Sequence, residues 1–589
     1  MIEFVDSTTQ QQLSVTGICL TLTVALCLLL LLTRPGRNLY RDAEQMLSRL
    51  AERRTQAAGV LFFSVIATRL LLLPLLPVPV PGIHDEYSYL LLADTFAHGR
   101  LANPPHPMWV SFETFHVNWL PTYSSMFPPA QGFILALGQW LGHPWIGVLL
   151  SDAAMCVAIF WMLQAWMPAR WAFLGAAIVA LKFGVSSYWM NSYWGGAVAA
   201  TGGALVLGAL ARIVKHATVG DALVAGLGLA MLANSRPYEG LFFCLPGAVW
   251  FIWWSAGRTK SRDPLRARVR NALVPLVLVL TLTALFIGYY NWRLTGDARL
   301  MPHELNAHTY YTIPRFLWQQ PKAELRYRNM AFQVFFNGWA RENYHTNWAD
   351  ARRVSKEKIA RYLTTFFWPG AQLILPALPF LFVDRKMRLL AATLGIGAVS
   401  VFAVVWSNPH YAAPLTCVFC ALLVQAIRHL RTMRVSTVRF GIALSRAAFL
   451  LLILDTANHA VYGVCDPLLF PCSGNRDRAL MSEKLEHLSG KHLIVVRYAT
   501  LHNPHNEWVF NGADIDSAKV VWARELDAQQ NAKLLAYFKD RQVWLVEPDT
   551  NPAEIKPYTI PDDAPDRLLR GEAPSSAGTQ SANGGRIEN

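Results

Sequence analysis

Long apolar runs recur along most of the chain, separated by short polar segments. A bilayer-spanning helix needs about 20 mostly apolar residues, and twelve stretches approach or reach this length. These predicted spans are residues 14–33, 58–80, 144–167, 171–189, 194–213, 219–236, 240–255, 272–292, 363–383, 389–406, 411–427 and 438–455. The pattern therefore predicts a polytopic α-helical membrane protein with about 12 transmembrane helices.

Basic residues collect in every second segment between the predicted spans. The basic segments are 34–54, 170, 212–215, 258–270, 385–388 and 428–439. Short basic loops stay in the cytoplasm by the positive-inside rule, and one orientation places all of them there. We then expect the external segments to be 81–143, 190–193, 237–239, 293–362, 407–410 and everything after 456. In a bacterial inner membrane, both termini are predicted to be periplasmic.

Composition agrees with a lipid environment. Only 16% of the residues are charged and 53% are hydrophobic, whereas a soluble protein carries about 25% charged residues. The net charge of +14 resides largely in the predicted cytoplasmic loops, so we expect no nucleic-acid partner. Glu3 and Asp6 precede the first apolar run, where a cleaved signal peptide would be basic. We therefore predict a retained helix over 14–33.

Strand and helix patterns alternate after the last predicted span. Residues 492–498, 519–522 and 543–547 have the pattern of short strands, whereas 476–489 and 528–541 have that of helices. This alternation predicts a small α/β domain, which we assign to 456–560 and expect to be periplasmic. Large apolar residues become rare after this point, so 561–589 is predicted to be disordered.

Two pairs of cysteines invite opposite interpretations. Cys417 and Cys420 have the spacing of a redox or zinc motif, but they lie within an apolar span without nearby ligands, which favours thiols of the core. Cys465 and Cys472 follow the last span. They are predicted to form a disulfide if that side is an oxidising periplasm.

The first long external segment opens with the candidate chemistry. His84, Asp85 and Glu86 follow Pro81 and Gly82 at the mouth of the second span. Adjacent carboxylates at a membrane boundary can bind a divalent metal, act as a general base or simply be solvated, and their spacing does not separate these alternatives.

The stretch from Asp85 to Tyr89, followed by Gly99 and the proline-rich residues 104–107, resembles the first external loop of GT-C glycosyltransferases. It is most similar to the family-39 branch, which includes protein mannosyltransferases and the lipid A aminoarabinose transferase. Residues 127–129 and 135–138 are also similar to that branch. The resemblance covers 81–167 loosely and the layout of spans up to 455. The departures are His84 and the extra span within 1–57.

The resemblance implies a GT-C-like catalytic domain over 58–455 that uses external loops 81–143 and 293–362. Such an enzyme takes a sugar from a polyprenyl-phosphate carrier and gives it to a lipid, glycan or protein acceptor. It needs a base for the acceptor's proton and cations for the leaving phosphate. We assign the base to Asp85 and an orienting role to Glu86. A divalent metal is left open.

Cations at the external ends of spans are candidates for the phosphate site. Arg236 precedes Pro237 at the outer end of one span, and Lys182 lies in the outer half of another. Intramembrane charges are costly and often functional, although both side chains could merely reach the interface. Arg69 lies midway along its span and could instead form a structural pair with Asp152.

Further polar and aromatic residues near the predicted external face complete the candidate set. His410 and Tyr411 precede Pro414 and are similar to a late-span motif of the same branch that faces the donor phosphate; alternatively, His410 caps a helix. Tyr193 and Trp194 could stack on a sugar or belong to the interfacial aromatic belt. The residues assigned as candidate sugar or acceptor contacts are His84, Tyr89, Tyr193, Trp194, Tyr238 and Glu239. Residues 301–304 and 308–311 could form a lid.

Two other classes of function compete with the enzyme. A transporter or flippase would use Arg69, Lys182 and Arg236 as a translocation path, but transporters usually place ionisable residues near the midplane on paired broken helices. A scaffold whose periplasmic domain binds a partner would leave the acidic pair of the first loop without a role. The clustering of polar residues at one membrane face favours the transferase.

Overall fold

The computed structural model describes residues 34–257, 263–342, 348–434, 440–462, 474–500, 502–550 and 552–559. They separate into two compact units. The helical unit holds the described residues up to 106, those of 114–479, and 503–507. The sheet unit holds 107–113, 480–502 and the described residues from 508 onward. The predicted helix 14–33, the disulfide of Cys465 with Cys472, and the tail 561–589 lie outside the described residues.

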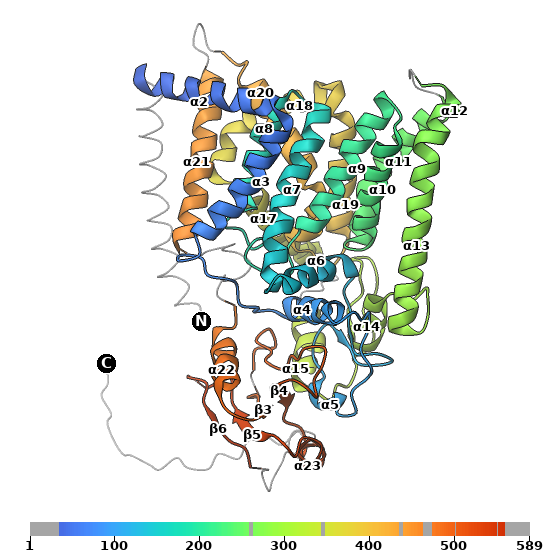
Figure 1. Ribbon diagram of the computed structural model, residues 1–589, viewed down its shortest axis with the longest axis vertical. Coiled ribbons are helices and arrows are strands. Elements are labelled where there is room, and N and C mark those ends of the chain that lie inside the picture. The colour runs from blue at the N-terminus through green and yellow to red at the C-terminus, as the bar shows by residue number, and fades with distance from the viewer. Residues whose placement is uncertain are drawn as a thin grey trace, which may run out of the picture. The chain divides into compact units, whose positions relative to one another are not determined.

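Long helices of the helical unit run side by side (Figure 1). They are α3 (Arg54–Leu71), α7 (Pro144–Trp166), α8 (Ala169–Lys182), α9 (Ala197–Lys215), α10 (Val219–Ala233), α11 (Pro237–Ser255), α13 (Val274–Thr295), α17 (Trp348–Phe366), α19 (Arg388–Ala403), α20 (Thr416–Leu430) and α21 (Phe440–Tyr462). The chain also forms α2 (Arg34–Glu52) and the shorter helices α4 (His84–Ala97), α6 (Pro129–Trp140), α12 (Leu265–Arg268), α14 (Pro302–Tyr310), α15 (Met330–Phe332), α16 (Ala340–Glu342) and α18 (Pro379–Val383).

Within the described residues, six helices are long and apolar enough to cross a membrane. They are Pro144–Trp166, Ala197–Lys215, Leu265–Thr295, Arg385–Ala403, Pro409–Leu430 and Phe440–Val461. The shorter helix Val219–Ala233 is also apolar. With the small C-terminal sheet described below, these helices confirm the predicted fold class.

The other predicted spans in the described part of the chain are shorter or interrupted helices. α3 ends at Leu71, shortly before Pro74, Pro77 and Pro79. α8 ends at Lys182 and is followed by an irregular, buried segment. The predicted span 363–383 is divided into the end of α17, the 3-10 segment η3 (Pro369–Ala377) and α18. Proline lacks the amide hydrogen of a helical residue and clashes with the preceding turn, which explains the interruptions after Leu71 and within 363–383, whereas no proline follows α8 before α9 begins.

One long helix displays the surface expected for contact with lipid. Only 11% of the most apolar window in Leu265–Thr295 is buried. Its exposed side chains include Val274, Val277, Leu278, Leu282 and Leu285. A continuous apolar face of this size would be unstable in water, so the acyl chains of a bilayer are its natural solvent.

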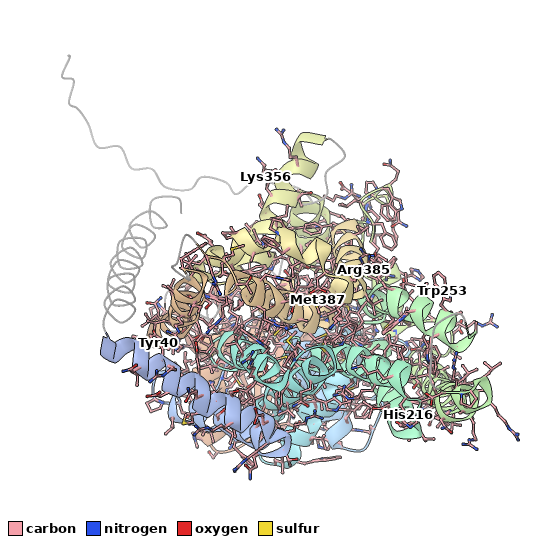
Figure 2. The ribbon with its side chains drawn as sticks, turned by 90° about the horizontal axis from the view of Figure 1, so that it is seen from above. Tyr40, His216, Trp253, Lys356, Arg385 and Met387 are labelled. Carbon is pink, nitrogen blue, oxygen red and sulfur yellow. The ribbon has the colours of Figure 1, made fainter. Side chains whose placement is uncertain are left out.

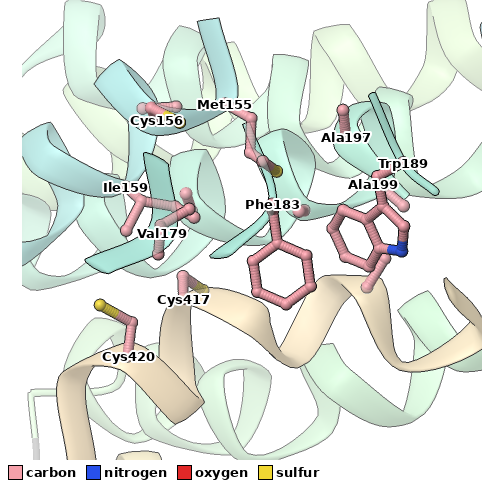
Figure 3. Close-up of a cluster of buried hydrophobic side chains, with 14 of the residues drawn as sticks. Met155, Cys156, Ile159, Val179, Phe183, Trp189, Ala197, Ala199, Cys417 and Cys420 are labelled. Atoms are coloured by element: carbon pink, nitrogen blue, oxygen red, sulfur yellow. The ribbon is translucent and has the colours of Figure 1, made fainter. Parts of the chain in front are cut away.

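The core of the bundle is built around close helix contacts (Figure 3). Met155, Cys156 and Ile159 of α7 pack in the same buried cluster as Cys417 and Cys420 of α20. A side chain at Gly175 of α8 would approach Cys420 Sγ to 2.9 Å, so glycine is needed for this close approach. Cys417 and Cys420 are free, buried thiols, which confirms their interpretation as core residues.

Basic segments gather at one end of the bundle. α2, α12 and α18, which ends two residues before Arg385, lie at this end, whereas α4, α6 and α14 lie at the other (Figure 1). Figure 2 looks along the bundle and labels Tyr40 of α2 at one side of the view and Arg385 nearer its centre. Glu44 of α2 forms ion pairs through its Oε1 atom with Arg431 Nη1 at 3.0 Å and with Arg446 Nε at 3.1 Å. The helix arrangement thus places the basic segments at the end of the bundle opposite α4 and its acidic pair.

Arg69 is fully buried, but its partners are not the expected carboxylate. Its guanidinium donates to Asn191 Oδ1 at 3.1 and 2.8 Å, to the Leu76 carbonyl at 2.7 Å and to the Pro77 carbonyl at 3.1 Å. Both carboxylate oxygens of Asp152 are buried without a hydrogen-bond partner. The proposed pair of Arg69 with Asp152 is therefore wrong, because an amide and the carbonyls of an interrupted helix end satisfy the guanidinium instead.

The sheet unit contains a four-stranded sheet in the order β4-β3-β5-β6. Strands β3 (His492–Val496), β4 (Val520–Arg524) and β5 (Gln542–Val546) are parallel, and β6 (Ile555–Pro557) is antiparallel to β5. Helix α23 (Ala528–Tyr537) connects β4 to β5, and α22 (Arg476–His487) precedes β3. The three parallel strands agree with the sequence. β6 was not predicted, because three exposed residues carry no periodic signal.

Candidate active site

Glu86 fixes the first turn of α4. It thereby also fixes the position of the neighbouring residue, Asp85. Its carboxylate accepts the backbone N–H groups of Gly82 at 2.8 Å, Ile83 at 3.3 Å and Tyr193 at 3.1 Å. A glutamate at this position satisfies amides that the first turn of a helix leaves unpaired. Burial raises the pKa of Glu86 to about 7, and the backbone hydrogen bonds oppose the rise. Glu86 therefore attaches α4 to the segment that contains Tyr193.

Asp85 lies one residue earlier on α4, in a different environment. Its Oδ2 atom is 3.7 Å from Nε2 of His116, and 23% of its side chain is exposed. Burial raises the pKa of Asp85 to about 6, although the positive charge of Arg236 lowers it in part. The carboxylate is thus largely ionised at neutral pH. Its pKa is also close enough to neutral pH for the group to accept a proton during a reaction.

His116 also belongs to the site, although no motif or spacing in the sequence singles it out. It has a positive φ of 61°, which is uncommon for a residue other than glycine and is often found at functional sites. Its carbonyl accepts a 2.7 Å hydrogen bond from the Ser88 hydroxyl of α4. Burial lowers the pKa of His116 to about 3, so its contact with Asp85 involves a neutral imidazole at pH 7.

Arg236 brings a positive charge to the same place from another element. It directly precedes α11, which begins with Pro237. Its guanidinium carbon lies 4.4 Å from the centre of the Tyr411 ring, the geometry of a cation–π contact. Its charge also acts on Tyr89 and Asp85. Burial raises the pKa of Tyr89 to about 12, so Tyr89 is a neutral phenol.

His410 and Tyr411 lie in η5 (Pro409–Leu415), which leads into α20. Nδ1 of the buried His410 is 3.1 Å from the Tyr188 hydroxyl, and the rings of His410 and Trp194 are 4.4 Å apart. Together with the Arg236–Tyr411 contact, these distances bring four of the sequence-selected residues into one group: Trp194, Arg236, His410 and Tyr411.

The long segment 293–362 contributes to the same region through α14. Arg315 forms an ion pair with Glu304 and lies 3.2 Å from Nδ1 of His303. Burial lowers the pKa of His303 to about 4, and the neighbouring charge of Arg315 lowers it further. Arg315 follows α14 in a loop without a recognisable motif, so only the folded chain shows that it is a second cation of this region.

Segment 503–507 belongs to the helical unit, although the chain on both sides of it belongs to the sheet unit. His84 Nε2 is 2.6 Å from the Pro504 carbonyl, and its ring stacks on Phe115 at 4.1 Å and on His505 at 5.8 Å. His84 is buried and holds this segment. In its protonated form His505 would lower the pKa of Asp85, so His505 is a further residue near the candidate base that sequence reasoning did not select.

Other selected residues lie in structural contacts. Lys182 forms a 3.7 Å ion pair with Asp455 of α21. Tyr193 donates from its hydroxyl to the Pro79 carbonyl at 2.8 Å, and Tyr238 donates to the Ser400 carbonyl at 3.1 Å. Glu239, in the first turn of α11, is close enough to interact electrostatically with Arg236. In the described part of the chain, no group of three or more His, Cys, Asp or Glu side chains is arranged to hold a metal ion.

No family model matches the chain, and no curated protein matches it by sequence. Its structure is similar to an Archaeoglobus fulgidus oligosaccharyltransferase with a tethered acceptor peptide (12% identity, TM-score 0.43, covering 83% of this chain and 69% of that one). It is also similar to ArnT from Cupriavidus metallidurans (13%, TM-score 0.46, 83% and 92%). A third similar structure is the arabinofuranosyltransferase AftD from Mycobacteria (15%, TM-score 0.38, 82% and 35%).

These three structures are of GT-C glycosyltransferases, the class that the first external loop resembles. Since all three TM-scores are below 0.5, the function of this chain has to be argued from its own side chains.

Proposed function

We propose that the protein is an integral membrane glycosyltransferase. It moves a sugar from a polyprenyl-phosphate carrier to a lipid, glycan or protein acceptor at the periplasmic face, with inversion at the anomeric carbon. The observation that carries the proposal is the meeting of an ionisable carboxylate, Asp85, with a cation, Arg236, close enough for each charge to shift the ionisation of the other.

The proposed reaction needs a base on one side of the sugar and a cation on the other. An acceptor oxygen or nitrogen forms a bond to the anomeric carbon, and its proton passes to the carboxylate of Asp85. The bond from the anomeric carbon to the phosphate oxygen breaks, and the electron pair leaves with the phosphate. Arg236 stabilises the charge that develops there, since charge-assisted hydrogen bonds to phosphate are strong.

The environment of each group supports its role. A base with a pKa of about 6 is ionised at neutral pH and is a stronger base than an exposed aspartate. Tyr411 lies against Arg236 at 4.4 Å and restrains the guanidinium, so less entropy is lost when a phosphate binds. His410 directly precedes Tyr411 in the chain, and its ring lies 4.4 Å from that of Trp194. The indole of Trp194 therefore offers an aromatic surface beside the proposed phosphate site.

The contacts of the three cations Arg69, Lys182 and Arg236 favour an enzyme over a transporter. A translocation path would need Arg69 and Lys182 to bind and release a substrate. Arg69 makes four hydrogen bonds within the protein, and Lys182 is paired with Asp455. Of the three cations suggested for transport, Arg236 is the one whose charge acts on Asp85.

Orientation in the membrane can be tested directly. Because the basic segments and α4 lie at opposite ends of the bundle (Figure 1), we expect a periplasm-active alkaline phosphatase reporter to be active when inserted after Gly99 and inactive when inserted after Gly257. A fluorescent protein that folds only in the cytoplasm should give the reverse result. Activity of the phosphatase at Gly257 alone would refute the periplasmic site.

Arg236→Ala is expected to weaken binding of undecaprenyl phosphate about 10- to 100-fold, because a charge-assisted hydrogen bond contributes about 1.5–3 kcal/mol. Binding is measured by titration of the purified protein in nanodiscs. Arg299→Ala is the matched control. Arg299 is exposed and lies between α13 and α14, at the same end of the bundle as α4. Equal affinity of the Arg236 variant and the control would exclude Arg236 from the phosphate site.

A further inference from the structure

Lys358, on the external segment that precedes η3, is a buried ammonium group. Its residue is 5% exposed, and Nζ donates a 2.6 Å hydrogen bond to the Val404 carbonyl. An ammonium group has three hydrogen-bond donors, so a single carbonyl leaves two of them unused. Burial of an ammonium group with two unused donors is costly unless an anion compensates its charge.

No carboxylate lies within ion-pair distance of Lys358 in the described part of the chain. The nearby charge that acts on it is another cation, Arg361, one turn later on α17. Burial lowers the pKa of Lys358 to about 8, and Arg361 lowers it further. The ammonium group of Lys358 is therefore not neutralised by any carboxylate among the described residues. This is the condition expected of a side chain that binds an anionic ligand.

Lys358 lies beside the loop that carries the candidate phosphate site. Its acceptor, Val404, belongs to the connection between α19 and η5, and the next residue, Val405, donates its N–H to the Arg315 carbonyl at 2.9 Å. One turn after Lys358, the Tyr362 hydroxyl contacts Ser407 Oγ at 2.8 Å and the Asn408 carbonyl at 2.9 Å. The same face of α17 thus follows this loop toward His410 and Tyr411.

We propose that Lys358 is a further ligand for the phosphate of the lipid-linked donor, acting from α17 while Arg236 acts from the start of α11. The inference rests on the proposed function. The ligand class is an anionic phosphate oxygen at the head of a polyprenyl chain. Two cations on separate elements would hold the leaving phosphate from two directions, which fixes its orientation relative to Asp85.

The test measures binding of undecaprenyl phosphate to the full-length protein in nanodiscs of neutral lipid. Lys358→Met keeps the length of the side chain and removes its charge, and we expect about tenfold weaker binding. Lys358→Arg keeps the charge and should bind within about threefold of the parent protein. Lys356→Met is the matched control, since Lys356 is an exposed lysine of the same helix (Figure 2) and should leave the affinity unchanged.

A second measurement separates ligand binding from a structural role. We expect the unfolding temperature of ligand-free Lys358→Met to equal or exceed that of the parent, because a buried charge is removed, while the rise in unfolding temperature caused by undecaprenyl phosphate becomes smaller. A lower unfolding temperature with unchanged affinity would overturn the inference and leave the transferase intact if Arg236→Ala still weakens binding. Failure of the parent protein to bind undecaprenyl phosphate would overturn both proposals.

Discussion

Asp85→Asn is expected to lower kcat for sugar transfer by about 10²- to 10⁴-fold, the usual contribution of a general base, without weakening the binding of undecaprenyl phosphate. Asparagine has nearly the same size as aspartate but cannot accept the acceptor's proton. Turnover is measured with a radiolabelled lipid-linked sugar in detergent. Asp94→Asn, on the same helix α4, is the control and should retain activity. An active Asp85→Asn enzyme would remove Asp85 as the base.

The ionisation of Asp85 gives this first prediction a pH dependence. The carboxylate is the active form, so turnover should fall as the pH decreases through about 6, the pKa in the folded protein. The acidic limb should disappear from the residual activity of Asp85→Asn. A limb near pH 4 instead would indicate an exposed carboxylate as the base.

The same pKa predicts that the charge of Asp85 destabilises the fold. Its pKa rises from 3.8 to about 6 on folding, so the unfolded chain releases this proton more readily. The destabilisation is fully present above pH 6 and absent below pH 3.8. It amounts to about 3 kcal/mol for a shift of about two units. Thermal unfolding at pH 7.5 should therefore show Asp85→Asn to be the more stable protein, with the difference vanishing at low pH.

Arg69→Met is expected to give the largest loss of stability, about 3–5 kcal/mol. The substitution leaves Asn191 Oδ1 and the Leu76 carbonyl buried without their donor and removes the donor of the part-buried Pro77 carbonyl, and each buried acceptor left without a donor costs about 1–3 kcal/mol. Arg69→Lys should rescue little, because a single ammonium cannot span the three acceptors. The measurements are the unfolding temperature in detergent and the monodisperse fraction on size exclusion.

Arg170→Met is the control for Arg69→Met, since Arg170 is exposed. An Arg69→Met protein with the unfolding temperature of this control would contradict the structural role. It would also reopen the alternative in which Arg69 serves a translocation path, because a cation that the fold does not need is free to act on a substrate.

Several parts of the fold could be predicted because they depend on local patterns. The apolar runs around α7, α9, α13 and α20 are long enough to form spans, and the structure has helices there. The prolines after Leu71 and around 369–379 were visible in the sequence, but hydropathy alone does not register that they end a helix. The predicted spans 58–80 and 363–383 therefore exceed the continuous helices that were found.

The candidate site was only partly accessible from the sequence. Asp85, Arg236 and Tyr411 were selected from short motifs, and the fold brings them into one electrostatic cluster. His116, Arg315, Lys358 and His505 were missed, since they stand in loops or on a polar helix without a local signal. Glu86 was selected as a partner of Asp85, but only its three backbone donors reveal that it anchors α4.

The sequence by itself determined the class of the molecule, since hydropathy and the placement of arginine set which segments enter a bilayer and which end of the bundle is basic. It also identified the acidic pair, because charge at a span boundary is conspicuous among apolar neighbours. The tertiary structure alone decided which of the two carboxylates is free to react and which cations face it. Desolvation and contact between elements far apart in the chain set the ionisation of a side chain, and no local pattern encodes them.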